Sequence, residues 1–324
     1  MTITAPACTF DGFGKMATAC FSDFRRTGED VRFLPLVKNE TLRSKTLLFP
    51  QIIKDSFTEK PIGPEVVFAP IDWMHIPSPN SVLVTTVDNA NLNLAAVDIL
   101  KMYKAVIVFN KFSEEAIRFW GVSAISTLLD PLGTQEIWSE DSSLKEDLFT
   151  FGVVDWTPFS ICKGHIDTVL EAFEWAFSGM RGMRIRILTH PDSHKSKHHD
   201  ERIEFTHSST QNWQLMEWFQ SLDCFVSTHE FQGIDLTMDC AVKCGAVPMG
   251  NQFALRERVW DQIGYPVFAK FTGGKFVLDK HEVADAMRFA YYDKCEFSQR
   301  KERCRNAVYP PVNWGKFLKS LGVI

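Results

Sequence analysis

The sequence predicts an α/β fold made of two halves, each with a largely parallel sheet. Short apolar, β-branched runs alternate with helical patterns, which is the sequence form of successive βαβ units. This rhythm stops at a polar stretch, SEDSSLKED at 139–147, and then begins again. The chain also has 324 residues, 45% of them hydrophobic, which is more than one typical domain needs and enough for two cores.

The expected strands are 1–6, 31–36, 65–69, 82–86 and 105–109 in the first half, and 149–154, 184–189, 223–227, 246–249 and 266–269 in the second. We place the boundary near residue 148. In IDTVLEAFEWAF at 166–177, apolar residues recur at three- and four-residue steps, which indicates a helix packed on a sheet. Arg184 and Arg186 alternate with isoleucines, which indicates a strand with one solvent-exposed face. The alternative is a strand that is buried at both ends. VNWGKFLKSLGVI is typical of a terminal helix.

Composition excludes several classes of protein. A net charge of −5 gives no global attraction to nucleic acid or to an anionic membrane. The first ten residues lack the basic and apolar regions of a leader peptide, and no eighteen uncharged apolar residues follow one another, so we expect a soluble, cytoplasmic protein. The eight cysteines never form a C-x-x-C pair, which predicts reduced, mostly buried thiols.

Loops that directly follow strands are where ligands bind in open α/β sheets. The first such loop, DGFGKMA, places Gly12 and Gly14 where small residues let a phosphate approach backbone amides and a helix N-terminus. The second expected strand ends without the acidic residue that a nicotinamide dinucleotide requires, so that ligand is disfavoured. A second loop, TTVDNAN, places Asp88 at a strand end, where it could be catalytic or could form an Asx turn or a helix cap.

Two loops of the second half carry charge. In WTPFSICKGH, Lys163 and Gly164 precede a helix, where an ammonium group and free amides together suit a diphosphate; the alternative is a solvated lysine. In STHEFQGIDLTMD, the strand-end residues are followed by Glu230 and then by Asp239 inside the next helix. Carboxylates there could accept both hydroxyls of a sugar diol; alternatively Glu230 caps the helix and Asp239 is exposed.

Taken together, these motifs resemble the family 4 retaining glycosyltransferases, which have the GT-B fold: two Rossmann-like domains facing across a cleft. The resemblance extends over nearly the whole chain, through AVIVFNKFSEEAIRFWGV, GVVDW, CKG, STHEFQGIDLTMDCAVKCGAVP and YPPVNWGKFLKSL. It implies an acceptor domain over 1–148, a nucleotide-sugar donor domain over 149–305, and a terminal helix over 306–324 that crosses back to the first domain. The implied activity is transfer of a sugar from a nucleoside-diphosphate sugar, such as a UDP-sugar, with retention of configuration.

The resemblance also implies roles for residues. Lys163 would neutralise the donor diphosphate, Glu230 would contact the donor sugar or phosphate, and Asp239 would bind the ribose. The candidate catalytic residues are Asp88, Lys163 and Glu230, and the candidate donor-binding residues are Gly12, Gly14, Lys163, Gly164, Thr228, His229, Glu230 and Asp239. No cofactor and no metal are expected, since lysine and helix amides replace the cation.

The sequence departs from the family's pattern at three places. In the first domain, the TTVDNAN run stands where the family has a histidine. Pro158 stands where the family has an arginine, and Met238 occupies the position of the second acid, with Asp239 one residue later. The candidates to replace the arginine are Arg181, Arg184, Arg256 and Lys270.

The acceptor and the reaction class stay open. Basic stretches at 181–202 and 298–305 could follow DNA phosphates, so the acceptor could be a modified DNA base, as for viral enzymes, or else a glycan or small molecule. Most basic stretches of this kind are simply solvated faces. His190, His194, His198 and His199 could hold a metal, but a polar loop explains them. The alternative functions are a nucleotide-sugar epimerase or phosphorylase on the same fold, and a non-catalytic nucleotide-sugar-binding partner subunit.

Overall fold

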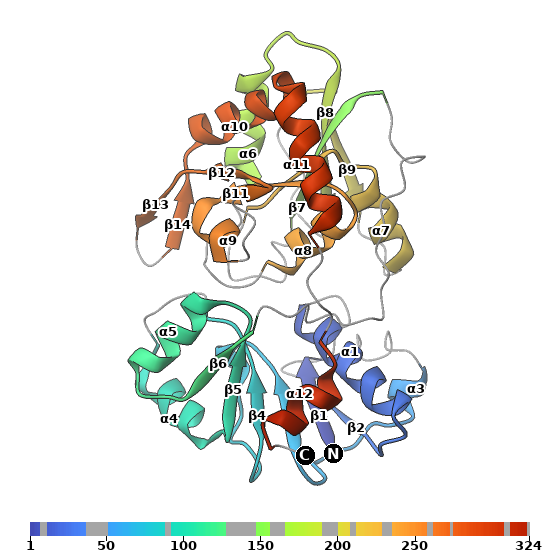
Figure 1. The fold of residues 1–324 in the computed structure, drawn as a ribbon, viewed down its shortest axis with the longest axis vertical. Helices are drawn as coiled ribbons and strands as arrows, with labels where there is room; N and C mark the ends of the chain where they lie inside the picture. The colour runs from blue at the N-terminus through green and yellow to red at the C-terminus, as the bar shows by residue number, and fades with distance from the viewer. Residues whose placement is uncertain are drawn as a thin grey trace. The chain divides into compact units, whose positions relative to one another are not determined.

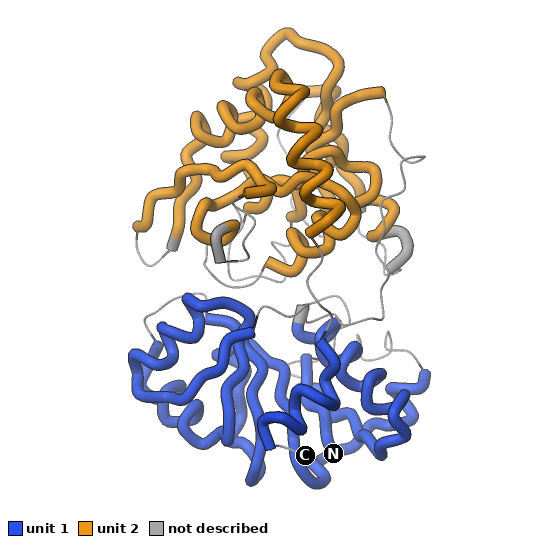
Figure 2. The backbone as a smooth tube through the Cα atoms, in the orientation of Figure 1, with its two compact units in different colours: residues 1–137, 309–324 blue, residues 138–308 orange. Residues whose placement is uncertain are grey.

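The chain forms two compact units, Met1–Ile137 with Tyr309–Ile324 and Trp138–Val308 (Figure 2). The computed structural model describes residues 1–6, 12–36, 51–87, 92–127, 147–155, 166–189, 200–207, 212–228, 235–257, 262–272, 275–307 and 312–322. The sequence-based boundary near residue 148 falls just after the change of unit between residues 137 and 138.

The first unit holds a parallel sheet in the order β2-β1-β3-β4-β5-β6 (Figure 1). Its strands are β1 (Thr2–Pro6), β2 (Arg32–Leu36), β3 (Glu65–Phe68), β4 (Val82–Val84), β5 (Ala105–Val108) and β6 (Ala124–Ser126). Its helices are α1 (Gly12–Arg26), α3 (Gln51–Lys54), the 3₁₀ turn η2 (Ile71–Trp73), α4 (Leu94–Met102), α5 (Lys111–Phe119) and α12 (Trp314–Ser320). The strand order reverses between β1 and β3, as in flavodoxin-like sheets.

The second unit holds a parallel sheet in the order β12-β11-β10-β7-β8-β9 and a separate hairpin, β13-β14. Its strands are β7 (Phe149–Asp155), β8 (Met183–Thr189), β9 (Ile203–His207), β10 (Cys224–Val226), β11 (Val247–Asn251), β12 (Tyr265–Val267), β13 (Ala269–Thr272) and β14 (Lys275–Leu278). Its helices are α6 (Ile166–Ala176), α7 (Asn212–Gln220), α8 (Leu236–Lys243), α9 (Gln252–Glu257), α10 (Lys280–Tyr292) and α11 (Lys294–Asn306). Counted from β7, this is the 3-2-1-4-5-6 order of the Rossmann fold.

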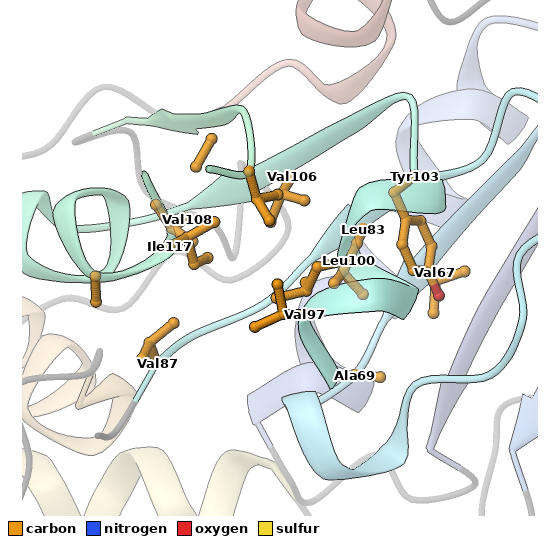
Figure 3. Close-up of a cluster of buried hydrophobic side chains, with 13 residues drawn as sticks. Val67, Ala69, Leu83, Val87, Val97, Leu100, Tyr103, Val106, Val108 and Ile117 are labelled. Carbon is orange, nitrogen blue, oxygen red and sulfur yellow. The ribbon is translucent and has the colours of Figure 1, made fainter. Parts of the chain in front are cut away.

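One hydrophobic cluster of the first unit lies between strands β3 to β6 and helices α4 and α5 (Figure 3). Both helices begin at an asparagine whose side chain accepts a backbone hydrogen bond: Asn93 from Ala96 and Asn110 from Ser113. These caps satisfy amides that have no partner inside the helix. Because the strands are buried on both faces, their side chains form continuous apolar runs, which is why the sequence pattern predicts them.

Helix α12 is held in the first unit by a buried tryptophan. Trp314 is 0% exposed, and its ring centroid lies 5.1 Å from that of Phe68 and 6.3 Å from that of Phe109. Its backbone amide donates to Asp23 Oδ2 on α1 at 3.2 Å, so a carboxylate stabilises the N-terminal end of α12. A side chain of this size, fully buried, contributes about 3 kcal/mol of hydrophobic stabilisation.

The two-sheet parallel α/β fold that the sequence predicts is confirmed. One expected strand, 266–269, is wrong in detail, because β12 ends at Val267 and β13 begins at Ala269, with Phe268 exposed between them. The solvent-exposed face expected for 184–189 is also wrong at Arg184, which is 7% exposed and binds Glu204 and Thr150. Glu204 lies on β9, a strand that the pattern did not predict.

The close approach of β11 and β12 requires a glycine. A Cβ atom at Gly264 would lie 2.6 Å from the backbone oxygen of Pro248, which cannot move without the strand. We therefore expect Gly264→Ala to lower the free energy of unfolding by about 1–3 kcal/mol, measured by chemical denaturation. Gly315→Ala is the control, because its Cβ would meet only ordinary contacts at 3.6 Å or more; equal stability of the two variants would contradict the prediction.

Candidate functional site

The strand order of the second sheet defines where a ligand should bind. β7 is followed in the chain by β8 on one side, whereas β10 lies on the other side, so the order reverses between β7 and β10. Ligands bind outside the carboxyl ends of the strands at such a point. The chain leaves β7 at Asp155 toward α6 and leaves β10 at Val226 toward α8. The two segments that carry the predicted donor residues therefore start from neighbouring strands at one edge.

Several predicted residues on these segments lie outside the described residues: Lys163, Gly164, His229 and Glu230. Thr228 and Asp239 are described. Thr228 follows β10 and is half-buried, and Asp239 lies in the first turn of α8. The assignment of these residues to donor binding stays a prediction.

A group of polar residues surrounds the carboxyl ends of β10 and β11, and we call it the carboxyl-edge cluster: Ser227, Thr228, Asp235, Asp239 and Asn251. Asp235 caps α8, accepting from the backbone amides of Thr237 at 3.0 Å and Met238 at 3.1 Å. The hydroxyl of Ser227 donates to the other oxygen of Asp235 at 2.5 Å. The cluster is therefore rigid where the strand meets the helix.

Asp235 and Asp239 correct one of the sequence-based alternatives. The helix cap is Asp235 and not Glu230, and Asp239 is 3% exposed and not a solvated side chain. The positive end of the α8 dipole stabilises both carboxylates. Sequence reasoning missed Asp235, although an aspartate just before an apolar helical run is the usual signal of a cap.

The position of Met238 on α8 is buried in an apolar contact, which explains why the acidic residue of this helix is Asp239 and not residue 238. Met238 stands at the second-acid position of the family pattern, is 1% exposed, and lies with its methyl carbon 3.4 Å from where a Cβ of Gly250 would be. The same Cβ would lie 3.1 Å from the Cβ of Ser227, so β10, β11 and α8 meet tightly here. A carboxylate could not be buried in that apolar contact without a cost of several kcal/mol.

Asn251 ends β11 and is 1% exposed. Its Oδ1 accepts a hydrogen bond from the amide of Phe253 at 2.9 Å, which caps α9. Sequence reasoning did not single out this residue. An asparagine between a strand and a helix ordinarily indicates a helix cap. A capping asparagine that also binds a ligand differs from an ordinary cap only in the hydrogen bonds of its side-chain amide, which the sequence does not give.

The first sheet reverses its order between β1 and β3, and the glycine motif follows β1. Gly12 and Gly14 lie within the first turn of α1, and the carbonyl of Gly14 accepts from the hydroxyl of Thr18 at 2.8 Å. The predicted residue Asp88 lies outside the described residues, one position after Val87. The amide of Val87 donates to Ser113 at 3.2 Å, which ties the end of this strand segment to α5.

Two of the arginines that could replace the missing cation are on the wrong edge of the sheet. Arg184 is the second residue of β8, and Arg181 precedes that strand, so both lie at its amino end. The carboxyl-edge cluster lies at the opposite ends of the parallel strands. Lys270 is an exposed residue of β13, and nothing is described of the side chain of Arg256.

Arginines of the two basic stretches have partners within the protein. Arg202 binds Asp200 and donates to the carbonyl of Phe177, and hydrogen bonding to Arg202 holds the pKa of Asp200 below its ordinary value. In the second stretch, Arg300 pairs with Glu296 at 2.8 Å and stacks over Tyr265. These two arginines make contacts within the second unit and stabilise it. This favours a structural role for them over a role in binding DNA phosphates.

No group of three or more His, Cys, Asp or Glu that could hold a metal ion occurs in the described part of the chain. The histidines at 190, 194, 198 and 199 lie outside it. None of the described helices combines the length and the apolar composition needed to cross a membrane.

No protein family matches the sequence, and no curated protein does. Solved structures do resemble the fold. WaaG, a glycosyltransferase involved in lipopolysaccharide biosynthesis, has a TM-score of 0.65 at 11% identity, and the match covers 100% of this chain and 99% of WaaG. Sucrose-phosphate synthase from Thermosynechococcus elongatus has a TM-score of 0.64 at 9% identity, covering 99% and 97%.

The pneumococcal O-GlcNAc transferase GtfA, crystallised with UDP and GlcNAc, has a TM-score of 0.58 at 12% identity. That match covers 80% of this chain but 56% of GtfA, so the chain spans little more than half of that longer enzyme. At these identities the likeness bears on fold alone. With two parallel six-stranded sheets and flanking helices that match these structures, the chain has the GT-B fold.

Proposed function

We propose that the protein is a glycosyltransferase that moves a sugar from a nucleoside-diphosphate sugar to an acceptor. The observation that carries this proposal is the order reversal between β7 and β10, where the segments bearing Lys163 and the carboxyl-edge cluster leave neighbouring strands. The similar structures that match end to end, WaaG and sucrose-phosphate synthase, are themselves named for glycosyl transfer or sugar-phosphate synthesis and support it.

In the proposed reaction, the bond between the anomeric carbon and the diphosphate oxygen breaks, and its electron pair leaves with the diphosphate. The acceptor oxygen bonds to the anomeric carbon with retention of configuration, and its proton passes to the departing diphosphate. Lys163 and backbone amides before α6 would hold the departing charge, so that no metal is needed. Asp239 would accept from the ribose hydroxyls, and Glu230 would contact the sugar.

For the acceptor, the partners of Arg202 and Arg300 favour a glycan or small molecule over DNA. Binding to a DNA acceptor would weaken steeply with added salt, whereas binding to a neutral glycan would not. Titration with oligonucleotide and oligosaccharide acceptors at two salt concentrations therefore separates the two classes.

The proposal is tested with UDP-, GDP- and ADP-linked sugars, following release of the nucleoside diphosphate and binding of each donor by calorimetry. We expect one nucleotide class to bind and to be turned over when an acceptor panel is supplied. A product that keeps its nucleotide, or a requirement for inorganic phosphate, would identify an epimerase or a phosphorylase instead. Binding without turnover over every acceptor would identify a non-catalytic subunit, and absence of binding would overturn the proposal.

A further inference from the structure

Only one of the two polar atoms in the side-chain amide of Asn251 has a hydrogen-bond partner in the described part of the chain. Its Oδ1 accepts from the amide of Phe253, which fixes the orientation of the side chain and leaves Nδ2 as a donor of two hydrogen bonds. Nδ2 is buried, and it has no hydrogen-bond partner in the part of the chain that is described. Buried donors without a partner are rare and destabilising, so one at a sheet edge calls for an explanation such as a ligand.

Asn251 lies at the position where a ligand is expected. It is the last residue of β11, the strand next to β10, and the residue before it, Gly250, packs against Ser227. Ser227 in turn donates to Asp235, so the amide belongs to the same tight junction as the acids of the cluster. A ligand oxygen that contacts this junction would supply the missing acceptor for Nδ2.

The charges of the cluster indicate which oxygen this is. Asp235 caps α8 and Asp239 lies in its first turn, so two carboxylates stand at this helix end, and a diphosphate beside them would be repelled. A sugar hydroxyl is at once a donor and an acceptor, so it can donate to a carboxylate while it accepts from an amide. We propose that Asn251 donates to a hydroxyl oxygen of the transferred sugar and helps to select it; this inference rests on the proposed function.

The informative variant is Asn251→Ser. Serine is as good a helix cap as asparagine, so the hydrogen bond to Phe253 can be kept while the unused Nδ2 is removed. The control is Asn306→Ser, because Asn306 is exposed in the same unit and its Nδ2 already donates to the carbonyl of Glu302 at 3.0 Å. Dissociation constants are measured by calorimetry for the nucleotide sugar that the wild type binds and for its nucleoside diphosphate, together with the melting temperature.

We expect Asn251→Ser to weaken binding of the nucleotide sugar by about five- to tenfold, the effect of one neutral hydrogen bond. Binding of the nucleoside diphosphate should change less than about twofold, because it lacks the transferred sugar. The melting temperature should stay the same or rise, because the variant loses an unpaired donor and no hydrogen bond. A purely structural asparagine would give the reverse, a lower melting temperature with unchanged affinity. Asn306→Ser should leave both affinities unchanged.

Three results would overturn the inference. Equal affinity of wild type and Asn251→Ser for the nucleotide sugar would remove Asn251 from the site while leaving the proposed function intact. An equal loss for the nucleotide sugar and for the nucleoside diphosphate would assign Nδ2 to a ribose or phosphate oxygen of the nucleotide and not to the transferred sugar. Absence of binding of every nucleotide sugar by the wild type would end the proposed function and this inference together.

Discussion

Replacing Lys163 by alanine is expected to lower turnover of the nucleotide sugar by roughly a hundred- to a thousandfold. The departing diphosphate develops negative charge, and removal of one preorganised group that stabilises such charge typically costs about 3–4 kcal/mol of transition-state stabilisation. The effect should lie at the upper end of that range here. Pro158 leaves the site without the family's arginine, and Arg181 and Arg184 lie at the amino ends of the strands, where they cannot compensate.

The measurement is the rate of nucleoside diphosphate release at saturating donor and acceptor. Lys163→Arg should recover part of the rate because it keeps the charge, whereas Lys101→Ala, on the exposed last turn of α4, should behave as the wild type. Equal melting temperatures of the three variants would exclude a folding defect. Release by Lys163→Ala at the wild-type rate would remove this lysine from the mechanism.

Two of the strands that the sequence misses lie at sheet edges, although the edge strands β2 and β12 were expected at 31–36 and 266–269. Central strands such as β7 and β10 are buried on both faces and form short apolar runs that stand out. The missed strands β6 and β9 are the outermost of their sheets, and an edge strand carries polar residues such as Glu204. The β13-β14 hairpin was missed although two glycines, Gly273 and Gly274, separate its short strands in the sequence, which ordinarily indicates a hairpin turn.

Some residues of the candidate site could be predicted from the sequence and others could not. Thr228 and Asp239 could be assigned to one edge of the second sheet because they follow a strong strand and lie on a helix with a clear pattern. Asp235 and Asn251 could not be ranked, since both act as helix caps and a cap needs no ligand to explain it. Which donors and acceptors are already used depends on contacts between segments far apart in the chain, and a single sequence does not contain that information.

The second large effect is expected at Glu65, a fully buried carboxylate at the start of β3. Its Oε1 accepts from the hydroxyl of Thr4 at 2.5 Å and pairs with Nε2 of His75 at 3.2 Å. Its Oε2 accepts from the hydroxyls of Ser78 and Ser81, each at 3.0 Å. The cluster joins β1, β3 and the segment that leads into β4, toward the amino ends of the strands of the first sheet.

Glu65→Ala should lower the free energy of unfolding of the first unit by about 3–5 kcal/mol, because it removes one member of a buried polar network and leaves the others unpaired. Glu29→Ala is the control: Glu29 is exposed and pairs with Lys319 at 3.5 Å, so the expected change is below about 0.5 kcal/mol. Chemical denaturation at pH 7, followed by tryptophan fluorescence, measures both.

The same carboxylate should give the first unit an acid-sensitive stability. Burial alone would raise the pKa of Glu65, but hydrogen bonds from His75, Thr4 and Ser81 and the charge of His75 lower it from 4.5 to about 2. Because the pKa is lower in the folded than in the unfolded state, the stabilisation is fully present above about pH 4.5 and is lost as the pH falls toward 2. The shift corresponds to about 3 kcal/mol.

Glu65→Gln separates this effect from general acid denaturation, since glutamine has the shape of the protonated side chain and does not titrate. Between pH 5 and pH 2, about 3 kcal/mol of the wild type's loss of stability should be absent from the variant, while the loss from other carboxylates remains in both. Denaturation curves at half-unit steps of pH measure the difference. Parallel pH profiles for wild type and Glu65→Gln would show that the four contacts do not favour the ionised carboxylate, and the network would then owe its stability to packing alone.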